Sequence, residues 1–238
     1  MKKVFLTFIV FAIANFVALA QNTFSFPEIS DQKDGELQMT IGERIKKMQI
    51  PDDVIDKLST GELLTICLDF PYNIDIFFYD DFQKGFEILK KEFNGYEELM
   101  KRPDLYEVII TKGNSLQKEI ERVYQLSEIE RGEFSIKWFF FEMIVAQDEI
   151  LLNFSENTES TLMATILNNK ETKENFPSIF SPLNEIPTIL SIVKIALQNP
   201  ELYPIEEDIK DELIDFTYNP LGLNENIIKS VQMIISNK

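Results

Sequence analysis

The spacing of apolar residues is the feature that most constrains how this 238-residue chain can fold. Apolar side chains recur three and four residues apart, which is the period of one face of an α-helix. Two stretches show the pattern best: Leu63, Ile66, Cys67 and Phe70, and then Phe82, Phe86, Leu89 and Phe93. Sustained alternation with a period of two, which is typical of half-buried strands, is almost absent. The sequence therefore predicts an all-α protein.

Residues with known capping chemistry mark several helix ends. Ser59 and Glu62 have the spacing of a capping box, and Pro71 ends the helix that follows them. Pro103 predicts the start of another helix, and Gly113 predicts its end. These signals divide the chain into short helices with short joints.

The segment Trp138–Leu152 is apolar nearly all round, which is typical of a helix buried in the middle of a domain. Three further helical patterns follow it: Pro187–Gln198, Ile205–Tyr218 and Leu223–Ser236. Helices joined by short turns favour antiparallel neighbours. We therefore expect antiparallel helix pairs packed as an irregular solenoid-like or bundle domain.

Shifts in composition divide the chain into five parts. We expect a signal peptide over 1–20, a linker or N-terminal arm over 21–42, a main helical domain over 43–168, an exposed loop over 169–182, and a C-terminal helical lobe over 183–238 packed on the main domain. The expected loop is polar, carries both charges and contains proline, which is typical of a surface connection.

The first twenty residues have the features of an export signal. Lys2 and Lys3 precede the apolar run Val4–Phe16, and Ala18–Ala20 supplies a small-residue cleavage pattern before Gln21. A retained membrane anchor is the alternative, but the apolar run is shorter than the roughly 20 residues that a spanning helix prefers. We expect a periplasmic or extracellular protein, with no membrane insertion after cleavage.

The acidic composition restricts the partners. The chain carries 23 basic and 40 acidic residues and has a formal charge of −17. Removing Lys2 and Lys3 with the signal leaves 21 basic against 40 acidic residues, a charge of −19. Such a surface repels phosphate backbones and anionic lipid heads, so we expect no nucleic-acid partner.

The absence of histidine from the sequence removes several chemistries. Ser-His-Asp and Cys-His nucleophile activation and histidine-based zinc or iron sites all need that side chain. Cys67 is the one cysteine, so no intramolecular disulfide can form, and thiolate metal clusters are also excluded. Cys67 lies within an apolar stripe and is expected in the core; a reactive thiol is the alternative. We expect no cofactor.

Carboxylates are the remaining catalytic groups. Glu142 lies in an apolar segment, and an apolar setting raises a carboxyl pKa toward that of a general acid. Two carboxylates could then hydrolyse a glycosidic bond. However, Ser135, Glu142 and Glu149 fall on one helical stripe, so we expect Glu142 to face water. A carboxylate-based glycan hydrolase is therefore the alternative rather than the first hypothesis, and no catalytic residue is assigned.

Two features are weak candidates for binding sites. Asp75, Asp80 and Asp81 cluster after Pro71 and could supply oxygens to calcium, although no calcium-loop motif is present. The alternative role of Asp80 and Asp81 is to cap the N-terminus of the next helix.

The second feature is a group of aromatic residues beside these aspartates. It comprises Phe77, Phe78, Tyr79 and Phe82. These residues could pack in the core, or they could form an exposed recognition patch.

Three segments carry a resemblance to a known family. They are Ile50–Pro71, Gly85–Arg102 and Ala146–Leu152. Together they resemble the helical region of an uncharacterised family of exported bacterial proteins. Longer members of that family carry a C-terminal segment with a Cys-His motif, which this sequence does not have. The resemblance implies export and an α fold, and it implies no active site.

These observations favour a binding or scaffold protein over an enzyme. We expect an exported helical protein that engages another protein or a cell-envelope component.

Overall fold

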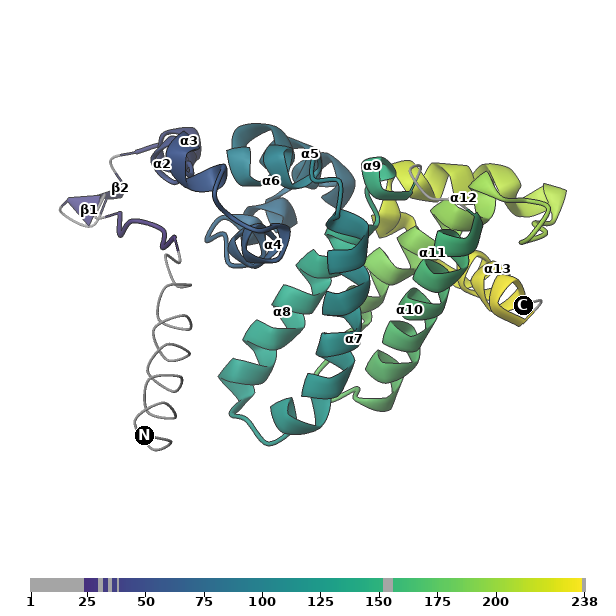
Figure 1. Cartoon of the computed structure of the whole chain (residues 1–238). Coiled ribbons are helices and arrows are strands. Elements are labelled where there is room, and N and C mark those ends of the chain that lie inside the picture. The colour runs from purple at the N-terminus through teal and green to yellow at the C-terminus, as the bar shows by residue number, and fades with distance from the viewer. Residues whose placement is uncertain (1–23, 30–31, 34–35, 38, 152–155, 237–238) are drawn as a thin grey trace, which may run out of the picture.

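The computed structural model describes residues 24–29, 32–33, 36–37, 39–151 and 156–236 (Figure 1). The expected signal peptide lies outside the described residues. The chain has an all-α fold, as the sequence predicts. One small exception lies in the N-terminal arm, where the strands β1 (Gln32–Lys33) and β2 (Glu36–Leu37) pair antiparallel.

The arm is held to the helices by aromatic contacts. The ring centroid of Phe26 lies 5.5 Å from that of Phe70 and 5.8 Å from that of Phe93. Phe70 and Phe93 are themselves stacked at 4.1 Å. The arm therefore adds side chains to the core.

Short helices form the first part of the fold, at the upper left of Figure 1. They are α2 (Ile41–Lys47), α3 (Asp52–Ile55), α4 (Thr60–Leu68), η1 (Asn73–Phe78), α5 (Phe82–Glu92) and α6 (Asn94–Leu99). The predicted capping box at Ser59 and Glu62 begins α4, and Asp81 caps α5 by accepting a hydrogen bond from Gln83 N at 2.8 Å.

Four longer helices form a bundle. They are α7 (Leu105–Val123), α8 (Glu128–Val145), α10 (Glu156–Asn175) and α11 (Ile186–Gln198). Helix α7 packs on α8 and α10, and α11 packs on the same two helices, so each of the four has two neighbours within the bundle. The short elements α9 (Asp148–Leu151) and η2 (Pro182–Glu185) connect them. This arrangement is a bundle; a solenoid-like stack is not shown.

The C-terminal helices cover one side of the bundle. They are α12 (Glu207–Tyr218), η3 (Pro220–Gly222) and α13 (Glu225–Ser236). All three contact α11, and η3 also contacts α5. Elements from the first part and from the end of the chain therefore both contact α5.

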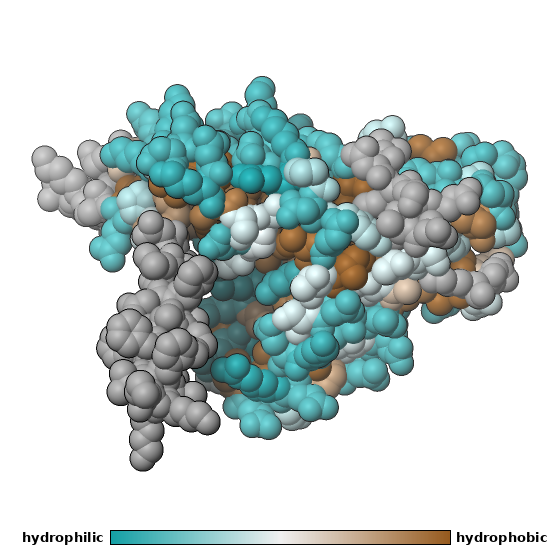
Figure 2. Space-filling view, in the orientation of Figure 1, coloured by the Kyte–Doolittle hydropathy of each residue, from teal (hydrophilic) through white to brown (hydrophobic). Residues whose placement is uncertain are grey.

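The core is centred on the second half of α8. Every residue from Trp138 to Ala146 is buried, as the all-round apolar pattern predicts. Cys67 is also a buried free thiol, as expected, and burial raises its pKa well above the usual value. Figure 2 shows hydrophilic residues over much of the visible surface, with hydrophobic residues exposed in separate patches.

Three predicted helix boundaries are wrong. The apolar segment Trp138–Leu152 is not one helix, because α8 ends at Val145 and α9 covers Asp148–Leu151. The helix expected to end at Gly113 continues to Val123 as α7, because α10 packs closely against that glycine. The loop expected over 169–182 is helical up to Asn175, and Asn169 and Lys173 within it are buried. Polar side chains are tolerated there because they have partners; Gln117, for example, donates to the Asn169 side chain at 2.8 Å.

The contact at Gly113 gives a test of the α7–α10 packing. A Cβ on Gly113 would lie 2.8 Å from Thr165 Cγ2, whereas a Cβ on Gly132 of α8 would meet nothing within 4 Å. In a helix interior, alanine is more stable than glycine by about 1 kcal/mol, so Gly132→Ala should raise the unfolding free energy of the protein. Overpacking at Gly113→Ala should leave that variant about 1–3 kcal/mol less stable than Gly132→Ala in urea unfolding.

The cause can be separated by a second substitution. Thr165→Ser removes the Cγ2 methyl and keeps the hydroxyl that donates to Thr161 O. Gly113→Ala should therefore cost less stability in the Thr165→Ser background than in the wild-type background. An equal loss of stability from Gly113→Ala in both backgrounds would show that the contact with Thr165 Cγ2 is not the reason for the glycine.

Candidate functional site

Glu142 is the carboxylate considered for catalysis. The prediction that it faces water is wrong, because its side chain is buried. Its exposed fraction is 4%. Lys173 of α10 lies 2.7 Å from Glu142 Oε2, and Lys173 is itself only 2% exposed. The helical stripe indicated the wrong environment because the partner that makes burial possible comes from another helix.

A hydrogen-bond network completes this buried ion pair. Trp138 Nε1 donates to Glu142 Oε1 at 2.9 Å, and Thr188 Oγ1 donates to Glu142 Oε2 at 2.6 Å. Lys173 also donates to the Asn184 carbonyl at 2.6 Å and contacts the Thr188 hydroxyl. The network joins α8, α10 and α11, and its bonds occupy both carboxylate oxygens. This geometry supports a structural role and not that of an acid open to a substrate.

A second pair of carboxylates lies at the surface, across Lys90. The ammonium of Lys90 lies 3.0 Å from Glu87 Oε1 and 2.6 Å from Glu149 Oε1. Partial burial acts to raise the pKa of Glu149, but the hydrogen bond and the charge of Lys90, together with a backbone hydrogen bond, outweigh it and hold that pKa below its usual value. A lowered pKa is the opposite of what a general acid needs near neutral pH.

Two hollows adjoin these side chains and share Glu87. A cleft of about 430 Å³ lies among α5, α9, α11 and α12, and its lining includes Asp148, Lys194 and Tyr218. Lys194 donates to Asp148 Oδ1 at 2.8 Å and to the Ala146 carbonyl at 3.0 Å. A larger groove of about 660 Å³ lies along α5, α6 and α9. Volumes of this size are typical of ligand sites in proteins.

The predicted aromatic group is divided between the core and the surface. Phe82 is buried, and Phe77 packs with its ring centroid 5.3 Å from that of Phe82 and 5.2 Å from that of Phe139. Phe78 is 79% exposed, and Tyr79 is 36% exposed. The 3₁₀ turn of η1 turns some side chains inward and others outward, so two of the four residues are available to a partner.

The three aspartates considered for calcium do not come together. Asp81 caps α5, and Asp80 is exposed. Asp75 is partly buried, which raises the pKa of its carboxyl, although Arg44 opposes this shift. Among the residues that the structure describes, no group of three acidic, cysteine or histidine side chains could hold a metal ion.

Sequence reasoning missed two sets of residues. Lys173 falls in the expected loop and Thr188 in the helical pattern Pro187–Gln198, and only the packing of α10 and α11 on α8 brings them to Glu142. Tyr218, at the end of α12, and Leu221 of η3 are exposed apolar side chains, and η3 contacts α5. Their only local signal was a large apolar residue at the end of a helix.

Comparison with known proteins adds no relative: no family model, no curated protein and no solved structure matches the chain. Within the described part of the chain, no helix has both the length and the apolar character needed to cross a membrane.

The ion pair can be tested by substitution. Lys173→Met leaves the Glu142 carboxylate buried without its cation, which should cost about 3–5 kcal/mol of unfolding free energy. The double variant Glu142→Gln/Lys173→Met should lose less than the sum of the two single variants, because each single change leaves a partner uncompensated. Urea unfolding of the four proteins measures the coupling, and strictly additive losses would contradict it.

Glu185, beside this network, should make stability depend on pH. Burial raises the pKa of its carboxyl above 4.5, although the charge of Lys173 opposes the shift. The folded state then binds the proton more tightly than the unfolded state, so the contribution of Glu185 to stability falls as pH rises from 4.5 through its folded pKa. As pH rises from about 4 to about 7, the unfolding free energy of Glu185→Gln should increase relative to that of the wild type. A difference that stays constant with pH would contradict this assignment.

Proposed function

We propose that this protein is an exported helical binding or scaffold protein that engages another protein or a cell-envelope component. The observation that carries the proposal is the exposure of Phe78 on η1. A large aromatic side chain left in water on a rigid element is typical of an interaction site.

The base of this surface is firmly packed. Ile76 of η1 is fully buried, and Phe77 packs against Phe82 and Phe139. Phe78 and the neighbouring Ile74 are therefore held outward by a fixed backbone. A preformed surface pays little ordering entropy on binding, which favours affinity.

Further apolar side chains lie beside the same helix. Both η1 and η3 pack on α5, and Tyr218 and Leu221 near η3 are exposed. Several exposed apolar groups around one helix support a protein-sized partner. The net charge of −17 argues against nucleic acid, because a phosphate backbone would be repelled.

The alternative function, a carboxylate-based glycan hydrolase, finds less support. Glu142 is enclosed by hydrogen bonds, and Glu87 and Glu149 share the Lys90 ammonium. A hydrolase needs one protonated and one charged carboxyl facing the same sugar. Release of sugars from cell-wall polysaccharide by the purified protein, abolished by Glu149→Gln, would favour this alternative.

A capture experiment tests the binding function. The protein lacking residues 1–20 is immobilised and exposed to an envelope fraction from the producing cell, alongside the variant Phe78→Ser. The wild type should retain one partner in stoichiometric amount, and the variant should lose most of it at unchanged thermal stability. Serine removes the apolar contact area of exposed side chains without opening a core cavity.

Ile129→Ser is the matched control. Ile129 is 76% exposed, in the first turn of α8, at the end of the bundle remote from α5 (Figure 1). This variant should retain the partner as the wild type does. Equal retention by all three proteins, or by none, would contradict the role of η1.

A further inference from the structure

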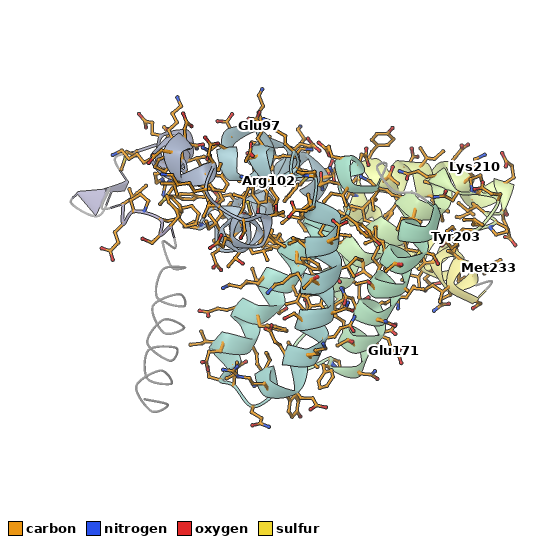
Figure 3. The ribbon with its side chains drawn as sticks, in the orientation of Figure 1. Glu97, Arg102, Glu171, Tyr203, Lys210 and Met233 are labelled. Atoms are coloured by element: carbon orange, nitrogen blue, oxygen red, sulfur yellow. The ribbon has the colours of Figure 1, made fainter. Side chains whose placement is uncertain are left out.

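We propose that the groove along α5 and α6 binds an acidic amphipathic peptide helix supplied by a partner protein. We call this hollow the lysine groove. Its lining comprises Lys84, Glu87, Ile88, Lys90, Lys91, Glu97, Met100, Lys101 and Glu149. Figure 3 shows Glu97, one of these residues, on the upper edge of the molecule at α6. This site is separate from Phe78, and the inference goes beyond the proposed function by giving the chemistry of a ligand.

The charge of the groove differs from that of the chain. Four lysines and three glutamates line it, whereas acidic residues outnumber basic ones 40 to 23 in the whole sequence. Lys90 is paired with Glu87 and Glu149, and Lys101 lies 2.7 Å from Glu97. These pairs involve all three glutamates of the groove.

Two lysines of the groove, Lys84 and Lys91, take no part in these ion pairs. Lys84 and Lys91 are exposed, and neither forms an ion pair with a residue that the structure describes. They lie seven residues apart on α5, which is two helical turns and places them on the same side of the helix. Two positive charges about 10 Å apart match carboxylates two turns apart on a peptide helix.

The floor of the groove is apolar. Ile88 and Met100 are partly exposed there, and the aliphatic stems of the lysines extend the apolar lining. Methionine adapts its shape to different side chains, which suits it to a peptide-binding surface. An amphipathic helix laid in such a groove buries its apolar face and turns its charged residues to the rim.

The walls of the groove are fixed before binding. Lys90 is mostly buried and ties α5 to Glu149 at 2.6 Å. The N-terminus of α6 is held by Asn94, whose side chain donates to the Ile50 carbonyl at 2.7 Å and accepts from Ile50 N at 3.0 Å. A groove held at both walls needs little rearrangement to receive a ligand.

A short acidic peptide fits these features better than a polyanion. A phosphate backbone would leave the apolar floor of the groove unfilled. The surrounding negative charge of the chain would repel an extended polyanion, whereas a short peptide can gain from Lys84 and Lys91 together with its own apolar face.

Fluorescence anisotropy with a designed peptide tests the proposal. The probe is a labelled helix of about 15 residues, with leucines on one face and glutamates on the other. It should bind the wild type, and raising the salt to about 0.3 M should weaken binding because the rim charges are screened. Lys84→Glu/Lys91→Glu should weaken binding about tenfold, because two attractions become repulsions.

Matched variants separate local charge from net charge. Lys118→Glu/Lys229→Glu changes two exposed lysines on α7 and α13 and alters the net charge equally. It should weaken binding by no more than about twofold, because screening limits charges more than a Debye length away. Ile88→Ser should weaken binding about fivefold without changing the charge, because it removes apolar area from the floor.

Several outcomes would overturn the proposal. Equal binding by the two double lysine variants would remove the role of Lys84 and Lys91. Equal binding of a peptide with lysines in place of glutamates, or of a scrambled peptide without an apolar face, would remove the recognition of acidic amphipathic helices. Preferential binding to anionic lipid vesicles would assign the groove to a membrane surface. Unchanged partner capture by Phe78→Ser would contradict the role proposed for η1 and leave this test unaffected, so the two proposals can fail independently.

Discussion

The rest of the structure depends on the complete burial of the second half of α8. Trp138–Ala146 packs on every side, and its one charged residue, Glu142, is matched by Lys173 and Thr188 from two other helices. A buried carboxylate without partners would be very costly, so α10 and α11 must lie where these partners reach it. With Cys67 as the one cysteine, packing and this network take the place of a disulfide.

The same core positions the surfaces proposed to bind partners. Phe82 of α5 packs on Phe139 of α8 with ring centroids 5.8 Å apart, which fixes α5 to the bundle. The outward residues of η1 lie on one side of α5, and the lysine groove follows its length. Exposed apolar and cationic groups are thereby held on a rigid helix, which is the arrangement that preorganised recognition requires.

The features predicted from the sequence are those that depend on neighbours along the chain. The stripe Phe82–Phe93 and the box at Ser59 involve residues a few positions apart, and the structure confirms both. The features that were missed depend on distant residues: Glu142 is buried because Lys173 lies 31 positions further on, and α7 continues through Gly113 because α10 needs room there. The division of Phe77 from Phe78 likewise follows from the way η1 sits on α8. Export stays a prediction, because residues 1–20 lie outside the described part.

Native-state hydrogen exchange of the α8 amides tests the central claim most directly. If the burial of Trp138–Ala146 holds the fold together, these amides should exchange only through global unfolding. Their opening free energy should then equal the unfolding free energy from urea, and should exceed that of the amides of α12 and α13. Exchange of Phe139–Val145 through a smaller local opening, with α12 or α13 more protected, would contradict the account.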